Sequence, residues 1–175
     1  MNRRTFDQFA RYNCWANARL YAAVLALSDR DYRRSTGVFF GSLRGTLNHL
    51  LTADRIWLHR LTGEGDAPAR LDTILHDDRR DLARARLAED RRLLTVIGGY
   101  ADADFGRVLN FHTTTGVPQS QPIGEILLHM FNHQTHHRGQ AHACLSILTG
   151  AEPPSLDMLL LQRGVPAPDL DALLQ

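Results

Sequence analysis

Five of the nine histidines in this 175-residue chain fall between positions 129 and 142, far more than random placement would put there. Imidazole is the commonest side-chain ligand for transition metals in proteins. His133 and His137 are one helical turn apart, which is the spacing of the two helical ligands in H-E-x-x-H zinc sites. This pair therefore indicates a site for a divalent metal ion.

The position of these histidines around a helix predicts which of them face the core. With a rotation of about 100° per residue, His129, His133 and His137 share one arc. The same arc carries residues that are expected to be buried: Ile126, Cys144 and Ile147. His142 points nearly the opposite way and is expected to be exposed. An unpaired polar group in the core is costly, and one metal ion satisfies several.

The spacing leaves alternatives to the pair open. His136 lies at the edge of the arc and pairs with His133 at i+3, a spacing that can also chelate. His129 could replace His137 as a ligand, or it could support the ligands through a hydrogen bond. Cys144 could be a fourth ligand, although small buried cysteines more often fill the core.

A third ligand must come from another helix, and His49 is the candidate. It lies at the edge of the apolar stripe formed by Leu50, Ala53 and Trp57 on a helix predicted over residues 43–61. Three histidines leave one coordination position open, which is typical of catalytic rather than structural zinc sites.

Hydrophobic periodicity predicts four long helices to hold these ligands, and we expect an all-α fold. The predicted helices cover residues 3–27, 43–61, 75–97 and 123–148, with Ser42 as an N-cap and Gly63 as a helix end. A short β-hairpin with Gly116 in its turn is predicted over 104–120, and a short helix over 156–162. With short connections, the four helices favour an antiparallel bundle that forms one domain over residues 1–175.

Composition excludes several classes of function. The net charge is +1, which argues against a nucleic-acid-binding protein. All 20 basic residues are arginine, so neither a lysine Schiff base nor a P-loop lysine is present. The arginine-rich stretch after position 76 is expected to be a solvated helix face.

The compartment is expected to be the cytoplasm. The first residues lack the apolar core of a signal peptide, and no apolar stretch is long enough for a membrane span. Cys14 and Cys144 are expected to be buried and reduced.

The histidine-rich segment LLHMFNHQTHHRGQAHACL resembles the signature of the DinB/YfiT-like superfamily, whose members are metal-binding four-helix bundles unrelated to the DNA polymerase of similar name. The segment YNCWANARL, which starts at Tyr12, is similar to the family's Y-x-x-W-A-N-x-R-L pattern. LNHLLTADRIWLHRL places His49 and Trp57 where the family has a histidine and an aromatic residue. The hairpin and GAEPPSLDMLLL also fit, so the resemblance covers nearly the whole chain.

This resemblance implies that His49, His133 and His137 are the metal ligands, because the family's H-R-G-Q run begins with a ligand and so selects His137 over His136. It also implies a cytoplasmic bacterial protein, often a homodimer, that acts on small molecules. Zinc is the first expectation for the ion, with nickel, iron and manganese left open. Family members include thiol-dependent S-transferases, isomerases and metal-dependent hydrolases.

Two reaction classes follow from an ion held by neutral ligands, because such an ion activates a bound water or a bound thiol. The resemblance favours transfer from a low-molecular-weight thiol cosubstrate over hydrolysis. No glutamate follows the first histidine as in H-E-x-x-H, so His129 is the candidate proton carrier. A non-catalytic metal-binding or stress-response protein is the third hypothesis.

Other residues near the signature could have either a structural or a functional role. Arg138 could hold an anionic substrate or form a structural ion pair, and the structural role is favoured. Tyr12, Trp15 and Trp57 could line a pocket, but aromatic residues at helical spacing are more often core.

Overall fold

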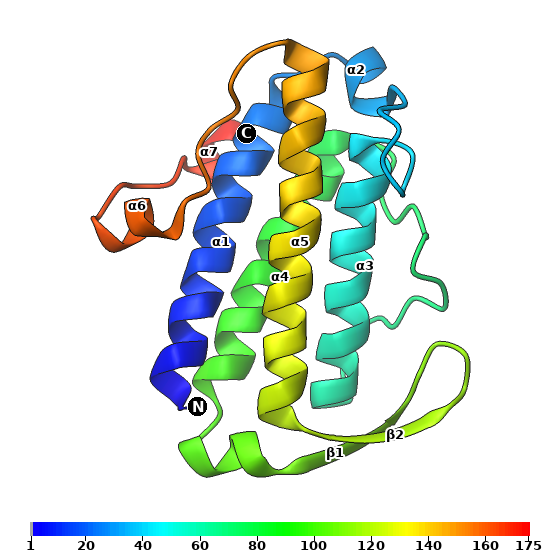
Figure 1. The fold of residues 1–175 in the computed structure, drawn as a ribbon, viewed down its shortest axis with the longest axis vertical. Helices are drawn as coiled ribbons and strands as arrows, with labels where there is room; N and C mark the ends of the chain where they lie inside the picture. Colours follow the sequence, from blue (N-terminus) through cyan, green and yellow to red (C-terminus); the bar gives the residue numbers. More distant parts are fainter. Residues whose placement is uncertain (1) are drawn as a thin grey trace.

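The computed structural model describes residues 2–175 and contains four long helices with short elements between them (Figure 1). The long helices are α1 (Arg3–Leu25), α3 (Leu43–Thr62), α4 (Arg79–Gly98) and α5 (Ile123–Thr149). The short elements are α2 (Asp29–Arg33), the 3₁₀ helix η1 (Asp102–Gly106), β1 (Val108–His112), β2 (Pro118–Pro122), α6 (Met158–Gln162) and α7 (Leu170–Leu173). The predicted all-α class, a four-helix bundle with a hairpin before the last long helix, is confirmed.

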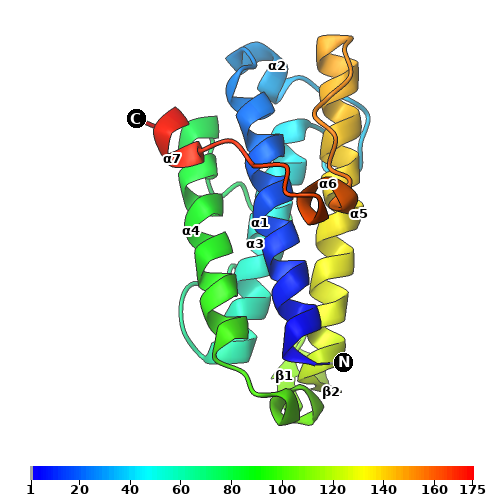
Figure 2. The same ribbon diagram turned by 90° about the vertical axis from the view of Figure 1, so that its left-hand side faces the viewer.

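The four long helices contact each other in a ring, in which α1 packs on α4 and α5, and α3 packs on α4 and α5. Helices α3 and α5 run in opposite directions, as do α1 and α4 (Figures 1 and 2). Helices α3 and α4 run the same way, because the connection over residues 63–78 returns along the length of α3. Ion pairs from Asp77 to Arg33 and Arg44 hold the end of this connection beside the start of α3.

Some predicted helix ends were wrong. The third long helix begins at Arg79 rather than at position 75, because the side chain of Asp78 accepts hydrogen bonds from the backbone amides of Arg80 and Asp81. The connection before it is therefore longer than predicted. The break expected at Ser28 is an N-cap that starts α2, and α7 had no periodic signal. The predicted caps Ser42 and Gly63 are confirmed.

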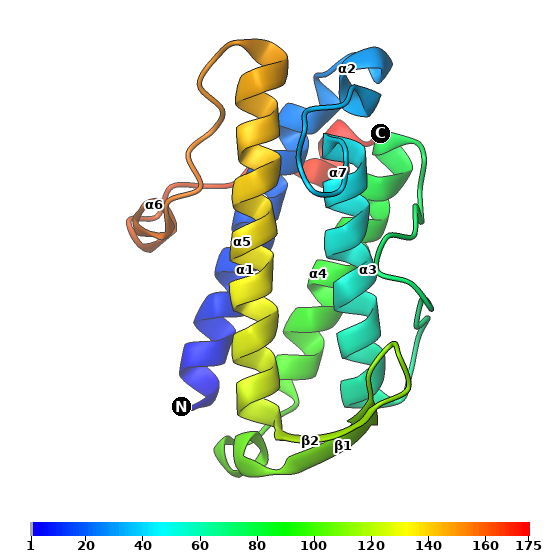
Figure 3. The same ribbon diagram turned by 45° about the vertical axis from the view of Figure 1, so that its right-hand side comes forward.

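The hairpin joins η1 to α5 beneath the end of α3 (Figure 3). Its strands are antiparallel, with Asn110 opposite Ser120, and Gly116 adopts a φ of +83° in the turn, as predicted. Within the described residues 2–175, no helix is long and apolar enough to cross a membrane.

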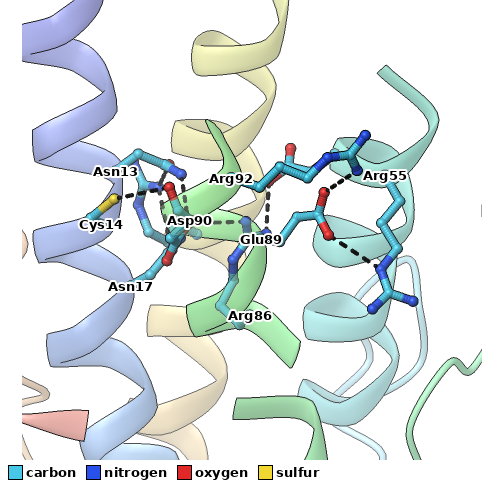
Figure 4. A network of polar contacts seen from close by, with 10 residues as sticks. Asn13, Cys14, Asn17, Arg55, Arg86, Glu89, Asp90 and Arg92 are labelled. Carbon is cyan, nitrogen blue, oxygen red and sulfur yellow. Dashed lines mark hydrogen bonds and ion pairs between the residues drawn. The ribbon is translucent and has the colours of Figure 1, made fainter. Parts of the chain in front are cut away.

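The charged stretch of α4 is not simply a solvated face, contrary to prediction. The Arg86 side chain is 1% exposed and forms ion pairs with Asp54 of α3 at 2.7 Å and with Asp90 at 2.9 Å. Asp90 also accepts a hydrogen bond of 3.0 Å from Asn17 of α1 (Figure 4). The opposite charges lie within ion-pair distance of one another, so the network ties three helices together.

Candidate metal centre

Three histidines meet between α3 and α5, and each offers a ring nitrogen to a common point. The nitrogens of His49, His133 and His137 lie within 4.8 Å of one another, and the Nε2 atoms of His49 and His133 are 3.0 Å apart. A tetrahedral zinc ion with Zn–N bonds of about 2.0–2.1 Å holds its nitrogens roughly 3.3 Å apart. The triad can therefore hold one metal ion after small rotations of the rings.

His49 is oriented by the long connection between α3 and α4. Its Nδ1–H donates to the backbone carbonyl of Leu71 at 2.8 Å, which leaves the Nε2 lone pair directed at the triad. The connection is itself fixed to α3, since Asn48 makes two hydrogen bonds to the backbone of His76, at 3.0 and 3.1 Å. A backbone segment that returns along α3 thus sets the tautomer of a candidate ligand.

His137 is oriented by a residue on its own helix. Its Nδ1–H donates to Oε1 of Gln140 at 2.7 Å, while the Gln140 amide donates to Nε2 of His136 at 3.2 Å. His136 therefore lies outside the triad and supports Gln140, and the i+3 alternative for the ligand pair is wrong. The Nε2 atom of His137 keeps its lone pair for the triad.

His133 must carry its proton on Nε2 in the metal-free protein, because Nε2 of His49 is the acceptor in their contact. Metal binding would move that proton to Nδ1, and the described residues hold no partner for this atom. The third ring is therefore less constrained than the other two.

Burial favours the uncharged form of all three rings. It lowers the pKa of His49 to about 4, although the hydrogen bond to the Leu71 carbonyl opposes the shift. Burial likewise lowers the pKa of His133 to about 3, helped by repulsion from His137 and His49. The pKa of His137 is also lowered by burial, although its bond to Gln140 opposes the shift. Neutral imidazoles are the form that binds metal ions.

Phe40 forms one wall of the triad. Its ring stacks on His49 with centroids 3.9 Å apart and meets the His137 ring edge-on at 5.5 Å. Phe40 comes close because Gly45, in the first turn of α3, has no side chain. A Cβ atom there would lie 2.1 Å from the carbonyl oxygen of Phe40.

The alternatives for a fourth ligand did not hold. Among residues 2–175, the cluster of potential ligands contains only the three histidines. Cys144 is buried, as predicted, and its sulfur contacts the Thr36 hydroxyl at 3.2 Å instead. His129 was expected on the buried arc but is exposed, with its ring against Trp57 at 5.4 Å and His133 at 5.8 Å.

Further residues of the histidine-rich helix also differ from expectation. His142 is half-buried rather than exposed, because the chain after α5 folds back and Nε2 contacts the Pro154 carbonyl at 3.1 Å. Ile147 is 58% exposed, since the end of α5 extends past the start of α3 (Figure 1). Cys14 is half-buried rather than buried.

Arg138 has a structural role, as favoured, but its partners among the described residues are neutral side chains rather than the expected ion-pair carboxylate. It is 2% exposed, donates to Asn13 of α1, and its guanidinium lies 5.0 Å from the centre of the Tyr12 ring. Tyr12 and Trp15 are core residues, whereas Trp57 is only partly buried. Arg138 therefore fixes α5 against α1 while the neighbouring His137 faces α3.

The sequence matches the DinB family over residues 1–169. The chain belongs to the DinB family. It is 25% identical over 153 residues to the protein DinB of Bacillus subtilis (strain 168), covering 82% of this chain and 86% of that protein. A crystal structure of a DinB-like protein from Bacillus cereus ATCC 10987 superimposes with a TM-score of 0.64 at 18% identity, covering 84% of this chain and 94% of that one. The structural match supports the DinB fold.

Sequence reasoning missed the residues that support the DinB triad from loops. Phe40 and the Leu71 carbonyl lie in connections without periodicity, and a backbone carbonyl has no residue-type signal. Gln140 could have been found, because it lies near His137 on the predicted arc and an amide at i+3 can reach an imidazole.

Proposed function

We propose that this chain is a metal-dependent enzyme acting on small molecules, with His49, His133 and His137 as the ligands of one divalent ion. The convergence of the three rings carries the proposal, supported by the carbonyl oxygens that orient two of them. Zinc is the first candidate, and nickel, iron and manganese also accept imidazole ligands.

The proposed chemistry is transfer of a low-molecular-weight thiol to an electrophile. A divalent ion in this site would act as a Lewis acid and favour the thiolate form of a thiol ligand. Gln134 follows His133, so the glutamate general base of H-E-x-x-H hydrolases has no counterpart at that position. Thiol transfer needs no such base and is therefore favoured over hydrolysis, the second candidate.

The side chains around the triad suit such a reaction. Phe40 covers one side of the rings and limits access of water. His133 is partly exposed and His129 lies next to it at the surface, where it could carry the proton released by a thiol to solvent. This arrangement also argues against a closed, non-catalytic metal site, which would have a fourth protein ligand.

The first experiment measures metal content by mass spectrometry on protein purified without a histidine tag. We expect about one transition metal per chain, lost in the His133→Ala/His137→Ala double variant and kept in His142→Ala, a control on the same helix. Absence of metal from the wild type, with no uptake of added zinc or nickel, would show that the triad is only a hydrogen-bonded cluster.

The second step tests turnover with metal-loaded protein, cysteine or glutathione as the thiol, and 1-chloro-2,4-dinitrobenzene as the electrophile. Sulfur–carbon bond formation would release chloride and one proton. His129→Gln should lower kcat by about 100-fold or more if it carries that proton, while metal content stays unchanged. Hydrolysis of a 4-nitrophenyl ester without thiol turnover would favour the second candidate. The homodimer expected from the family stays a prediction, which sedimentation would check.

A further inference from the structure

A cavity of about 490 Å³ lies at the hairpin end of α3, separate from the triad. It is lined by the last turns of α3, by residues 67–69 of the connection, and by β1 and the turn that follows it, which pass beneath α3 (Figure 3). None of the three triad histidines lines it. Its volume falls within the range of small-molecule sites.

Arg60 lines this cavity with a guanidinium group that has no carboxylate partner among the described residues. Its guanidinium lies 4.5 Å from the centre of the Trp57 ring and 4.9 Å from that of Phe111. The part of the chain that the structure describes gives it no ion pair or hydrogen bond, whereas nearby Arg55 pairs with Glu89 at 3.4 Å. Partial burial lowers the pKa of Arg60, and within residues 2–175 no carboxylate beside it opposes that shift.

Asn110 also borders the cavity, but its exposed side chain lies on the face of β1 opposite Phe111. There its Oδ1 accepts a hydrogen bond of 2.6 Å from the Ser120 hydroxyl across the hairpin. No aspartate or glutamate lines the cavity, and much of the remaining surface is apolar, including Ile56, Phe111 and Pro68. The lining thus offers a cationic donor at one place and apolar contact elsewhere.

We propose that this cavity binds a small amphipathic carboxylate. The carboxylate would accept hydrogen bonds from the Arg60 guanidinium, and the apolar body would lie on Ile56 and Phe111. Guanidinium and carboxylate match in a two-bond geometry. A free inorganic phosphate fits less well, because it would leave the apolar lining without contacts.

The cavity lies on the same side of α3 as the triad. Arg60 follows His49 by eleven residues, which corresponds to about 20° around the helix and roughly 16 Å along it. The rings of Trp57, His129 and His133 form a continuous line between the two places. An elongated carboxylate substrate could thus extend toward the triad; this extension rests on the proposed function, whereas carboxylate binding itself does not.

Isothermal titration calorimetry on chelator-treated protein tests the proposal with 4-phenylbutyrate and its neutral amide, 4-phenylbutanamide. The acid should bind about tenfold more tightly or better. Arg60→Gln should remove the preference for the acid, and Arg60→Lys should keep part of it. Arg30→Gln, at an exposed arginine of α2, should leave it intact. Unfolding midpoints check that each variant is folded.

Equal affinities for acid and amide would overturn the proposal, as would equal losses in Arg60→Gln and Arg30→Gln. Competition by inorganic phosphate at the same concentration as the acid would overturn the amphipathic class of ligand. Acid binding that requires added zinc and disappears in His133→Ala/His137→Ala would place the carboxylate on the ion, which contradicts the cavity site but supports the metal centre. If the protein binds the acid but never takes up metal, the result supports the carboxylate site in the cavity and contradicts the proposed metal centre.

Discussion

The proton on each imidazole decides how the triad responds to pH. His49 and His137 donate from Nδ1 to a carbonyl oxygen and so keep Nε2 free, and burial keeps the rings neutral. In the unfolded chain the same side chains titrate at about 6.5. The folded protein therefore binds fewer protons than the unfolded chain at mildly acidic pH.

The metal-free protein should lose stability as the pH falls from about 6.5 toward the folded pKa values of His49 and His133, which are about 4 and about 3. Above pH 6.5 both states are neutral, so no loss is expected there. Each ring contributes at most about 1.4 kcal/mol per pH unit in this window. Urea denaturation in the presence of a chelator, at intervals from pH 7.5 to 4.5, measures the slope. An unchanged slope in a His49→Asn/His133→Asn variant would contradict this assignment.

At the scale of elements, the triad depends on two connections as much as on two helices. The His133 and His137 pair could be predicted because helical periodicity puts residues four apart on one face. Phe40 and Leu71 could not, because their positions depend on how the connections fold back on α3. Gly45 lies on the predicted helix but determines where a connection packs, since its missing side chain lets the segment around Phe40 approach α3.

Gly45→Ala should therefore displace Phe40 and loosen the wall of the triad. In an open helical position the same change stabilises a protein by about 0.4–1 kcal/mol, and Gly98→Ala in α4 has that open space and serves as the control. We expect Gly45→Ala to lower the unfolding midpoint and weaken zinc binding, and Gly98→Ala to do neither. Zinc titration with a chromophoric chelator and thermal unfolding give the two readouts. Equal behaviour of the two variants would show that the Phe40 segment adapts without cost.

At the scale of the whole molecule, a buried polar layer crosses the bundle, although the charges of α4 were expected to face solvent. The charge pattern of α4 could not predict it, because Arg86 is buried only through partners on α3 and in the next turn of α4. Asn17 on α1 completes the layer (Figure 4). Sequence patterning distinguishes apolar from polar positions, but it does not show which polar residues meet across helices.

Removing the cation from this layer should be costly. Arg86→Met leaves Asp54 and Asp90 buried without their partner, and we expect a loss of about 3–5 kcal/mol in the free energy of unfolding. Arg11→Met, which breaks an exposed pair with Asp7, should cost less than about 1 kcal/mol. Urea denaturation of both variants gives the comparison. A small loss in Arg86→Met would mean that the two aspartates are readily hydrated or protonated.

The separation of His49 from His133, 84 residues along the chain, has a consequence for synthesis. At about 5–20 residues per second, the ribosome needs roughly 4–17 s to pass from one to the other. During this interval the growing chain has only one of the three ligands and cannot form the chelate. Capture of the ion by the full triad is therefore a late event, and the rate of metal uptake by newly made protein reports when α5 has docked onto α3.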